Sequence, residues 1–186
     1  VVPMGIIGHM YCGVYEGRLP GSDVPIYFLE HEQFYGRAGL YQQDGQGYLD
    51  NDNRFVFLSK AALELCKMLE FHPDVIHAHD WLTMLAGIEA RRVSGKPLVL
   101  HVHALEFDRS GENVNQAVYD IERFGMKHAD RVVAVSQLTK QPIVTRYDID
   151  PAKVEVVYNA VTNRSRQASG SRGTRRDKIV LFLGRI

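Results

Sequence analysis

Apolar residues follow two patterns along this chain, and the two patterns alternate after residue 53. Between residues 54 and 71 they recur at steps of three and four, as at Phe55, Leu58 and Leu65, which predicts an amphipathic helix. Short and nearly continuous apolar runs predict buried strands, and they cover residues 74–79, 97–103, 130–135 and 154–158. Helical segments are predicted between them, at residues 82–93, 113–128 and 137–147.

This alternation predicts an α/β fold, with a Rossmann-like parallel sheet that has helices on both faces. The segment before it has a different pattern. Residues 14–30 contain two β-rich runs around Leu-Pro-Gly-Ser-Asp, which predicts an N-terminal β-hairpin. Residues 31–53 are rich in tyrosine, glycine and asparagine without an apolar period, so we expect an aromatic loop.

The last residues divide the chain into expected domains. Residues 162–177, TNRSRQASGSRGTRRD, have the composition of a solvated linker, and the alternative is an arginine patch that holds phosphate. Residues 178–186, KIVLFLGRI, then begin a new strand. We therefore expect one domain over residues 1–161, a linker over 162–177, and the first strand of a second, truncated domain over 178–186.

Composition excludes several classes of partner. The 22 basic and 22 acidic side chains among 186 residues balance, which argues against nucleic acid, because that binding depends on neutralising phosphates. No apolar stretch approaches the ~20 residues that cross a bilayer, and the N-terminus lacks the features of a signal peptide. The two cysteines, Cys12 and Cys66, have no metal-binding spacing, so we expect reduced thiols in a cytoplasmic protein.

Polar side chains gather where two predicted strands end. His79, Asp80 and Trp81 end one strand, and His103 ends the next along the chain. Ligands of open α/β sheets bind at the carboxyl ends of the strands, so we expect these groups to meet at one crevice. Side-chain alternation places the two histidines of each His-x-His pair, His77 with His79 and His101 with His103, on one face. The first histidine of each pair lies inside its apolar run and is expected in the core.

Three interpretations of this cluster remain open from the residues alone. Zinc could be bound by the histidines with Asp80 in a metal-dependent hydrolase, although the spacing differs from the His-x-His-x-Asp-His pattern. A sugar could lie in the crevice, with Asp80 and His103 bonded to its hydroxyls and Trp81 stacked on its ring. The third interpretation is an α/β binding module without chemistry.

Longer segments add a resemblance to a known family. The strings IYFLEHEQFYGRAGLY, YLDNDNRFVFLSKAALEL and PDVIHAHDW resemble bacterial glycogen and starch synthases in order and spacing. The strings SGKPLVLHVHALEFDRSGENVN, ADRVVAVSQLTK and KVEVVYNAV resemble the wider group of retaining glycosyltransferases with two Rossmann-type domains, the GT-B type. Together these segments cover nearly the whole chain.

The resemblance implies an activity and an assignment of residues. Glucose from ADP-glucose or UDP-glucose is transferred to the 4-hydroxyl of an α-1,4-glucan with retention, without a metal or another cofactor. Asp80, His103 and Arg185 match the catalytic positions, and Arg185 would neutralise the donor phosphates. The positions assigned to the acceptor side are Tyr35, Arg37, Asp50, Asn51 and Arg54.

Departures from the family pattern modify these expectations. The Lys-Thr-Gly-Gly-Leu loop of the synthases is absent, with the first strand and helix, and Ala104 replaces the usual asparagine after His103. Leu82 replaces the usual histidine after the tryptophan. We therefore expect this polypeptide to be a part of the enzyme that is inactive by itself, lacks its C-terminal domain and dimerises through an unpaired sheet edge. Another nucleotide-sugar glycosyltransferase of the wider group is the alternative.

Overall fold

The computed structural model describes residues 1–160. The predicted linker at 162–177, the predicted strand at 178–186 and Arg185 lie outside the described residues.

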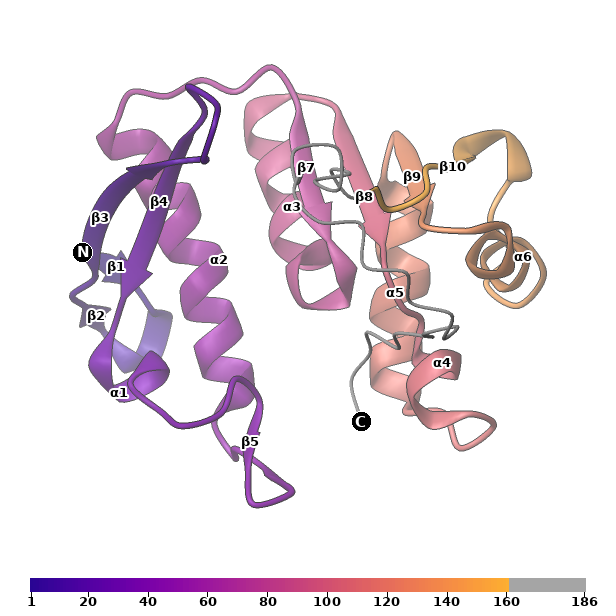
Figure 1. Ribbon diagram of the computed structural model, residues 1–186, viewed down its shortest axis with the longest axis horizontal. Coiled ribbons are helices and arrows are strands. Elements are labelled where there is room, and N and C mark those ends of the chain that lie inside the picture. Colours follow the sequence, from indigo (N-terminus) through magenta and orange to yellow (C-terminus); the bar gives the residue numbers. More distant parts are fainter. Residues whose placement is uncertain (161–186) are drawn as a thin grey trace, which may run out of the picture.

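A parallel sheet of four strands forms the centre of the described chain (Figure 1). Its strands run in the order β10-β9-β8-β7, and their bounds are β7 (Ile76–His79), β8 (Leu98–Val102), β9 (Arg131–Ala134) and β10 (Val154–Val156). Helices connect consecutive strands, namely α3 (Asp80–Ser94), α4 (Glu106–Ser110), α5 (Gln116–His128) and α6 (Gln137–Thr145). The predicted α/β fold with a parallel sheet is confirmed, and all four predicted strands are present.

The two faces of this sheet differ in burial. On β8, Leu98, Leu100 and Val102 are fully buried, whereas Val99 and His101 between them are half-buried. The buried side packs against α3 and α5 in one large core. The opposite side carries the histidines and stays partly open, so the described residues cover one of the two faces that the sequence predicted to be covered.

Two glycines allow the helices to approach closely. A Cβ on Gly87 of α3 would lie 2.9 Å from Leu98 Cδ1 and 3.0 Å from Ala78 Cβ, so α3 lies directly on the sheet. A Cβ on Gly125 of α5 would lie 2.9 Å from Met84 Cβ, so α5 lies equally close to α3. This packing fixes the start of α3 relative to the ends of β7 and β8.

The N-terminal part has a second, smaller core. The predicted hairpin is confirmed as β3 (Gly13–Arg18) and β4 (Pro25–Glu30), which pair in antiparallel register from Gly13 with Glu30 to Arg18 with Pro25. Phe34 and Phe57 are buried between this region and α2 (Asn51–Met68). The remaining short elements are β1 (Val2–Pro3), the 3-10 turn Gly5–Ile7, β2 (His9–Met10) and the 3-10 turn Pro151–Lys153.

Several boundaries differ from the sequence prediction, and the short helix α4 was not predicted. Residues 31–53 are not all loop, because they contain α1 (Glu32–Tyr35), the short pair β5 (Gln42–Gln43) and β6 (Gln46–Gly47), and the first turn of α2. Helix α2 begins at Asn51 rather than residue 54, and α3 begins at Asp80 rather than residue 82. In α2 a polar first turn, Asn51 to Arg54, conceals the true start. No helix within residues 1–160 is long and apolar enough to span a membrane.

Candidate functional site

Asp80 lies at the junction where β7 ends and α3 begins. Its φ of +56° is in the left-handed region, which costs energy for most side chains but is tolerated by aspartate. Thr83 supports the turn, because its hydroxyl donates to the carbonyl oxygen of His79 at 2.6 Å. Backbone strain of this kind collects at functional positions, where the surrounding structure maintains it.

The Asp80 carboxylate connects this junction to the end of the neighbouring strand. Its Oδ1 accepts the backbone N–H of His103 at 2.8 Å and that of Ala104 at 3.4 Å. The sequence predicted that the polar groups ending these two strands would meet, and the structure brings Asp80 and His103 together. The contact joins a side chain to a backbone, so Asp80 fixes the loop that carries the His103 ring.

The four strand-end histidines form a row on the open face of the sheet. His79 Nδ1 lies 3.0 Å from His103 Nε2, close enough for a hydrogen bond in which one ring donates. The rings of His101 and His103 stack with their centroids 4.3 Å apart. The predicted placement of each pair on one face is confirmed. His77, expected in the core, is exposed because its side of the sheet is the open one.

Burial and the neighbouring rings favour the neutral form of His79 and His101 in this row. Burial lowers the pKa of His79, and the neighbouring His77 and His103 lower it further. The pKa of His101 is lowered first by burial and then by His103 and His79. Neutral imidazoles both donate and accept hydrogen bonds, which suits them to orient the hydroxyl groups of a sugar.

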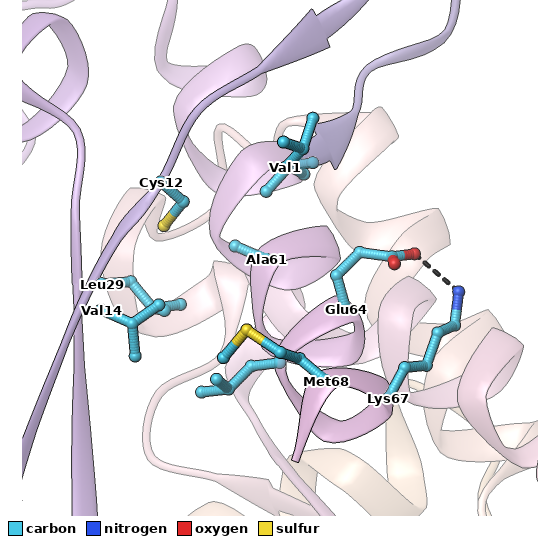
Figure 2. A pocket seen from close by; sticks show the side chains of 10 residues that line it. Val1, Cys12, Val14, Leu29, Ala61, Glu64, Lys67 and Met68 are labelled. Atoms are coloured by element: carbon cyan, nitrogen blue, oxygen red, sulfur yellow. Dashed lines mark hydrogen bonds and ion pairs between the residues drawn. The ribbon is translucent and has the colours of Figure 1, made fainter. Parts of the chain in front are cut away.

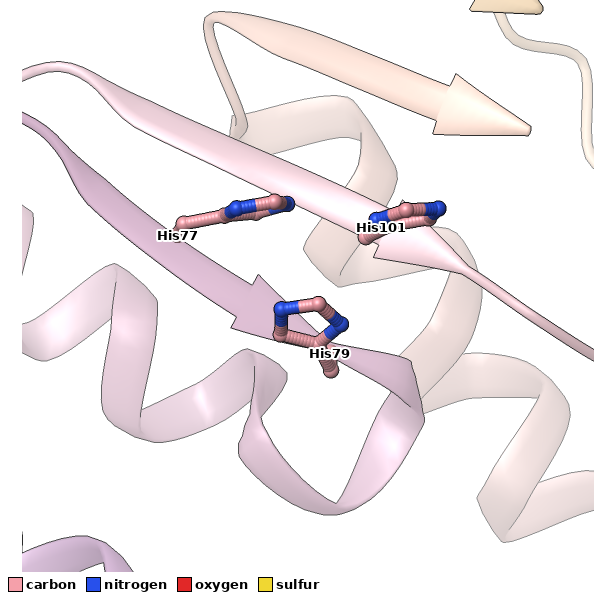
Figure 3. A group of neighbouring side chains, drawn as sticks. All are labelled: His77, His79 and His101. Atoms are coloured by element: carbon pink, nitrogen blue, oxygen red, sulfur yellow. The ribbon is translucent and has the colours of Figure 1, made fainter. Parts of the chain in front are cut away.

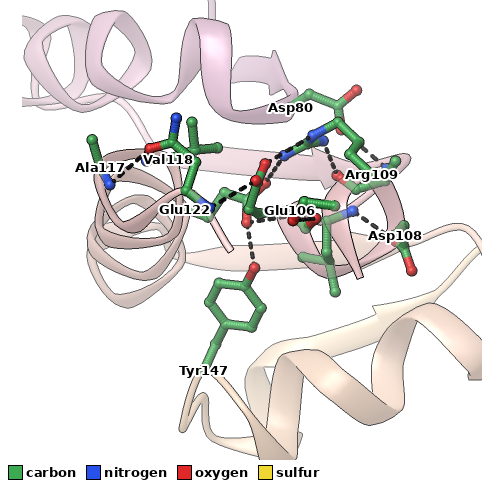
Figure 4. A network of polar contacts seen from close by, with 12 residues as sticks. Asp80, Glu106, Asp108, Arg109, Ala117, Val118, Glu122 and Tyr147 are labelled. Atoms are coloured by element: carbon green, nitrogen blue, oxygen red, sulfur yellow. Dashed lines mark hydrogen bonds and ion pairs between the residues drawn. The ribbon is translucent and has the colours of Figure 1, made fainter. Parts of the chain in front are cut away.

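A buried ionic network holds the other side of the same loop (Figure 4). Arg109 Nη1 donates to the carbonyl oxygen of Ala104 at 3.0 Å, and Nη2 donates to Glu122 Oε1 at 2.5 Å. Arg109 Nε also contacts Glu106 Oε2 at 3.3 Å. Asp80 therefore binds the N–H of Ala104 while Arg109 binds its C=O, and the loop after β8 is fixed from both directions.

Glu122 is the buried centre of this network. Its side chain is 1% exposed, and its Oε2 accepts the backbone N–H of Glu106 at 3.1 Å together with a short bond from the Tyr147 hydroxyl. Burial raises the pKa of the Glu122 carboxyl, and the Arg109 guanidinium and the Tyr147 hydroxyl oppose that rise. The residue pattern alone did not predict this network. One sequence feature could have indicated it: Glu122 is an acidic residue on the apolar face of the predicted helix 113–128.

The residues predicted for the acceptor side form a separate polar group at the start of α2. Arg37 binds Asp50 through two hydrogen bonds of 2.7 and 2.6 Å, which lower the pKa of that carboxyl. The buried Arg54 donates to the carbonyl oxygen of Phe34 at 2.7 Å and to Asn51 Oδ1 at 2.6 Å. These contacts connect α1 and the residues after it to the start of α2.

Tyr35 and Trp81 are the remaining predicted site residues in the described chain. The Tyr35 hydroxyl donates to the carbonyl oxygen of Arg54 at 3.0 Å, and burial raises the pKa of Tyr35 to about 12. Trp81 is half-buried and packs against the main core, so part of its ring has a structural role. The start of α2 and the carboxyl ends of β7 and β8 face the same end of the molecule, at the bottom of Figure 1.

A hollow of about 370 Å³ lies elsewhere, between the hairpin and α2 (Figure 2). Cys12, Val14 and Leu29 face Met68 across it, and an ion pair of Glu64 with Lys67 lies at its rim. Neither Asp80 nor His103 lines this hollow. Its mainly apolar lining offers little to a sugar, so the strand ends are the better candidate site.

Known proteins with similar sequences include bacterial glycogen synthases. It is 53% identical over 135 residues to glycogen synthase 1 of Geobacter metallireducens, which covers 69% of this chain and 26% of that protein. It is 58% identical over 113 residues to glycogen synthase 1 of Geobacter sulfurreducens, which covers 57% of this chain and 23% of that protein. The chain thus spans about a quarter of the length of these curated relatives.

The fold agrees with these matches. The catalytic domain of starch synthase IV from Arabidopsis thaliana, solved with ADP and acarbose, superposes with a TM-score of 0.55 at 16% identity. The superposition covers 81% of this chain and 37% of that one. Residues 1–152 match the family described as the starch synthase catalytic domain. The chain therefore belongs to the starch synthase catalytic domain family, as its resemblance to glycogen and starch synthases predicted.

Proposed function

We propose that this chain is the acceptor-side part of a retaining glucosyltransferase. The enzyme transfers glucose from ADP-glucose or UDP-glucose to the 4-hydroxyl of an α-1,4-glucan. The observation that carries the proposal is the hydrogen bond that the His103 backbone N–H donates to Asp80 at the carboxyl edge of the sheet, in a chain of the starch synthase family. Ligands of open α/β sheets bind at this edge.

His103 and Asp80 have distinct roles in this proposal. The exposed His103 ring binds a hydroxyl of the transferred glucose and sets the orientation of that sugar. Asp80 places the ring by holding its backbone, and the Asp80 charge lies near the sugar carbon where positive charge develops during transfer. Groups that are fixed before the reaction stabilise such charge most effectively.

The group at the start of α2 forms the acceptor side. Arg37 and Asp50 hold each other through two hydrogen bonds, and the buried Arg54 fixes the start of α2 through Phe34 and Asn51, so the polar groups here have a fixed geometry. Fixed polar groups bind a flexible glucan with a smaller entropic cost than mobile ones. Tyr35, Asn51 and Trp81 complete this surface.

The donor phosphates require cations, and Arg109, the cation near the His103 loop, is already paired with Glu106 and Glu122. We propose that Arg185 supplies one of them and that a second nucleotide-binding domain holds the rest of the nucleotide sugar. Arg185 lies outside the described residues, so this assignment rests on the FLGRI string. The two cysteines in the described chain are free thiols, which agrees with the proposed cytoplasmic location.

The two alternative functions, a metal-dependent hydrolase and another glycosyltransferase, are not equally supported. The metal-dependent hydrolase is wrong, because the chain belongs to the starch synthase family and matches glycogen synthases. In addition, Oδ1 of Asp80, the carboxylate in the zinc interpretation, accepts backbone N–H groups. Another glycosyltransferase of the wider group remains as the second candidate, and the donor and acceptor tested below decide between the two.

A transfer assay tests the proposal. The chain is assayed within the complete enzyme, with ADP-glucose and UDP-glucose as donors and glycogen as acceptor. His103→Ala and Asp80→Ala should each lower kcat at least about tenfold, because each removes a group fixed at the reacting sugar. His128→Ala is the matched control and should leave kcat unchanged, because the exposed His128 ring bonds to Phe124 in its own helix α5. Wild-type turnover in both site variants would reject the site.

A further inference from the structure

Three imidazoles from neighbouring strands gather on the open face of the sheet (Figure 3). His77 and His79 belong to β7, and His101 lies beside His79 in the register of β7 with β8. Each ring offers one nitrogen, and the three nitrogens all lie within 4.8 Å of one another. The cluster joins two strands, so the fold itself assembles it.

The His101 ring lacks the hydrogen-bond partners that buried nitrogen atoms usually have. Both Nδ1 and Nε2 of His101 are inaccessible to solvent and take no hydrogen bond within the described chain. Buried polar atoms are normally paired, so unpaired ones call for an explanation such as an ion or water. Two further imidazoles within reach make an ion the more specific explanation.

We propose that His77, His79 and His101 bind a divalent transition-metal ion of the zinc, cobalt, nickel and copper class. Neutral imidazole nitrogens are preferred ligands of these ions, and three of them leave one position of a tetrahedral site for water. Magnesium and calcium prefer oxygen ligands, which this trio does not provide. The ion is given no part in the proposed sugar transfer.

The surroundings of the trio support this assignment. His79 Nδ1 pairs with His103 Nε2 at 3.0 Å, which leaves His79 Nε2 to face the ion. A hydrogen bond to the second nitrogen of a ligand histidine orients the ring and tunes its basicity. The rings of His77 and His101 now stack at 5°, so they must turn for their lone pairs to converge. His77 and His79 are exposed and have room to turn.

Cobalt binding to the 186-residue chain tests the proposal directly. The protein is prepared without an affinity tag, treated with chelator and titrated with Co²⁺, whose visible d–d bands report coordination by imidazole. We expect saturation at one ion per chain and displacement of Co²⁺ by Zn²⁺. His77→Gln and His101→Gln should each weaken binding at least about tenfold, because each removes a ligand.

Matched controls separate this site from adventitious binding. His9→Gln and His72→Gln remove exposed histidines away from the cluster and should change affinity by less than about twofold. Absence of saturable binding at millimolar Co²⁺, or equal affinity in the cluster and control variants, would overturn the proposal. His77 is exposed, so His77→Gln should retain the wild-type circular dichroism and remains informative even if His101→Gln unfolds.

Discussion

Asp80 Oδ1 accepts the backbone N–H of His103 at 2.8 Å, so the first residue of α3 fixes the loop that follows β8. The bond joins positions 23 residues apart in the sequence. The acceptor is the charged Asp80 carboxylate, and the Asp80 backbone is in the left-handed region. This bond determines where the His103 ring lies.

Removing the Asp80 carboxylate should release the loop. A hydrogen bond to a charged group contributes about 1.5–3 kcal/mol, so Asp80→Ala should speed amide hydrogen exchange at His103 at least about tenfold. Asp80→Asn keeps an acceptor oxygen and should give an intermediate rate. Asp74→Ala, an exposed aspartate before β7, is the control. Equal exchange in Asp80→Ala and the wild type, measured by nuclear magnetic resonance, would contradict this role.

Arg109 should contribute more to stability than a surface arginine does. Arg109→Ala leaves Glu122 buried without its cation, and removing one partner of a fully buried pair costs about 3–5 kcal/mol. The Arg109 side chain is 35% exposed, so we expect a smaller loss of about 2 kcal/mol in the free energy of unfolding.

Urea denaturation measures this loss, and Arg92→Ala is the control. The Arg92 and Glu89 side chains are 70% and 54% exposed, so breaking that pair should cost less than about 1 kcal/mol. Equal losses in the two variants would show that the network around Glu122 does not hold the loop.

Asp130 should make the fold sensitive to acid. Arg91 binds its carboxylate at 2.8 and 3.0 Å, the Leu98 N–H donates to it at 2.8 Å, and these contacts lower the pKa of Asp130 from 3.8 to about 2. A depressed pKa stabilises the fold above the unfolded value, and that contribution disappears as the pH falls from about 4 to about 2.

Urea denaturation midpoints measured between about pH 5 and about pH 2 test whether Asp130 causes this acid sensitivity. Asp130→Asn should lose less stability over this range than the wild type does. Asp120→Asn, on the exposed face of α5, should follow the wild type. An unchanged acid dependence in Asp130→Asn would remove Asp130 as its cause.

The edge strand β7 should promote self-association. It ends the sheet in the order β10-β9-β8-β7, so its outer edge is unpaired within the described chain. Unpaired edges bind other strands, and we expect a concentration-dependent dimer of this polypeptide. Sedimentation equilibrium over a wide range of concentration checks this, and a monomer throughout would contradict it.

The sequence predicted the strands because near-continuous apolar runs have few alternatives, and it predicted that Asp80 and His103 meet because parallel strands end at one edge. It did not predict that Asp80 binds the backbone of His103. That contact depends on the left-handed turn at Asp80, which aspartate permits without requiring.

Contacts between distant segments were the hardest to predict. Arg109 and Glu122 are 13 residues apart and belong to different helices, so no local period relates them. The exposure of His77 was also missed, because an apolar run alone does not tell which face of a sheet is covered. Glu122 is buried because of contacts made in the folded chain, whereas its charge alone would predict an exposed side chain.

Glucan binding tests the central claim most directly, because it depends on neither the donor nor the proposed second domain. The labelled chain is titrated with maltoheptaose, and cellohexaose serves as the control with the opposite anomeric linkage. We predict saturable shift changes at Arg37, Asn51 and Trp81, on the proposed acceptor side, with maltoheptaose alone, and their loss in Arg37→Ala. No change at millimolar maltoheptaose, or the same changes with both sugars, would contradict the account.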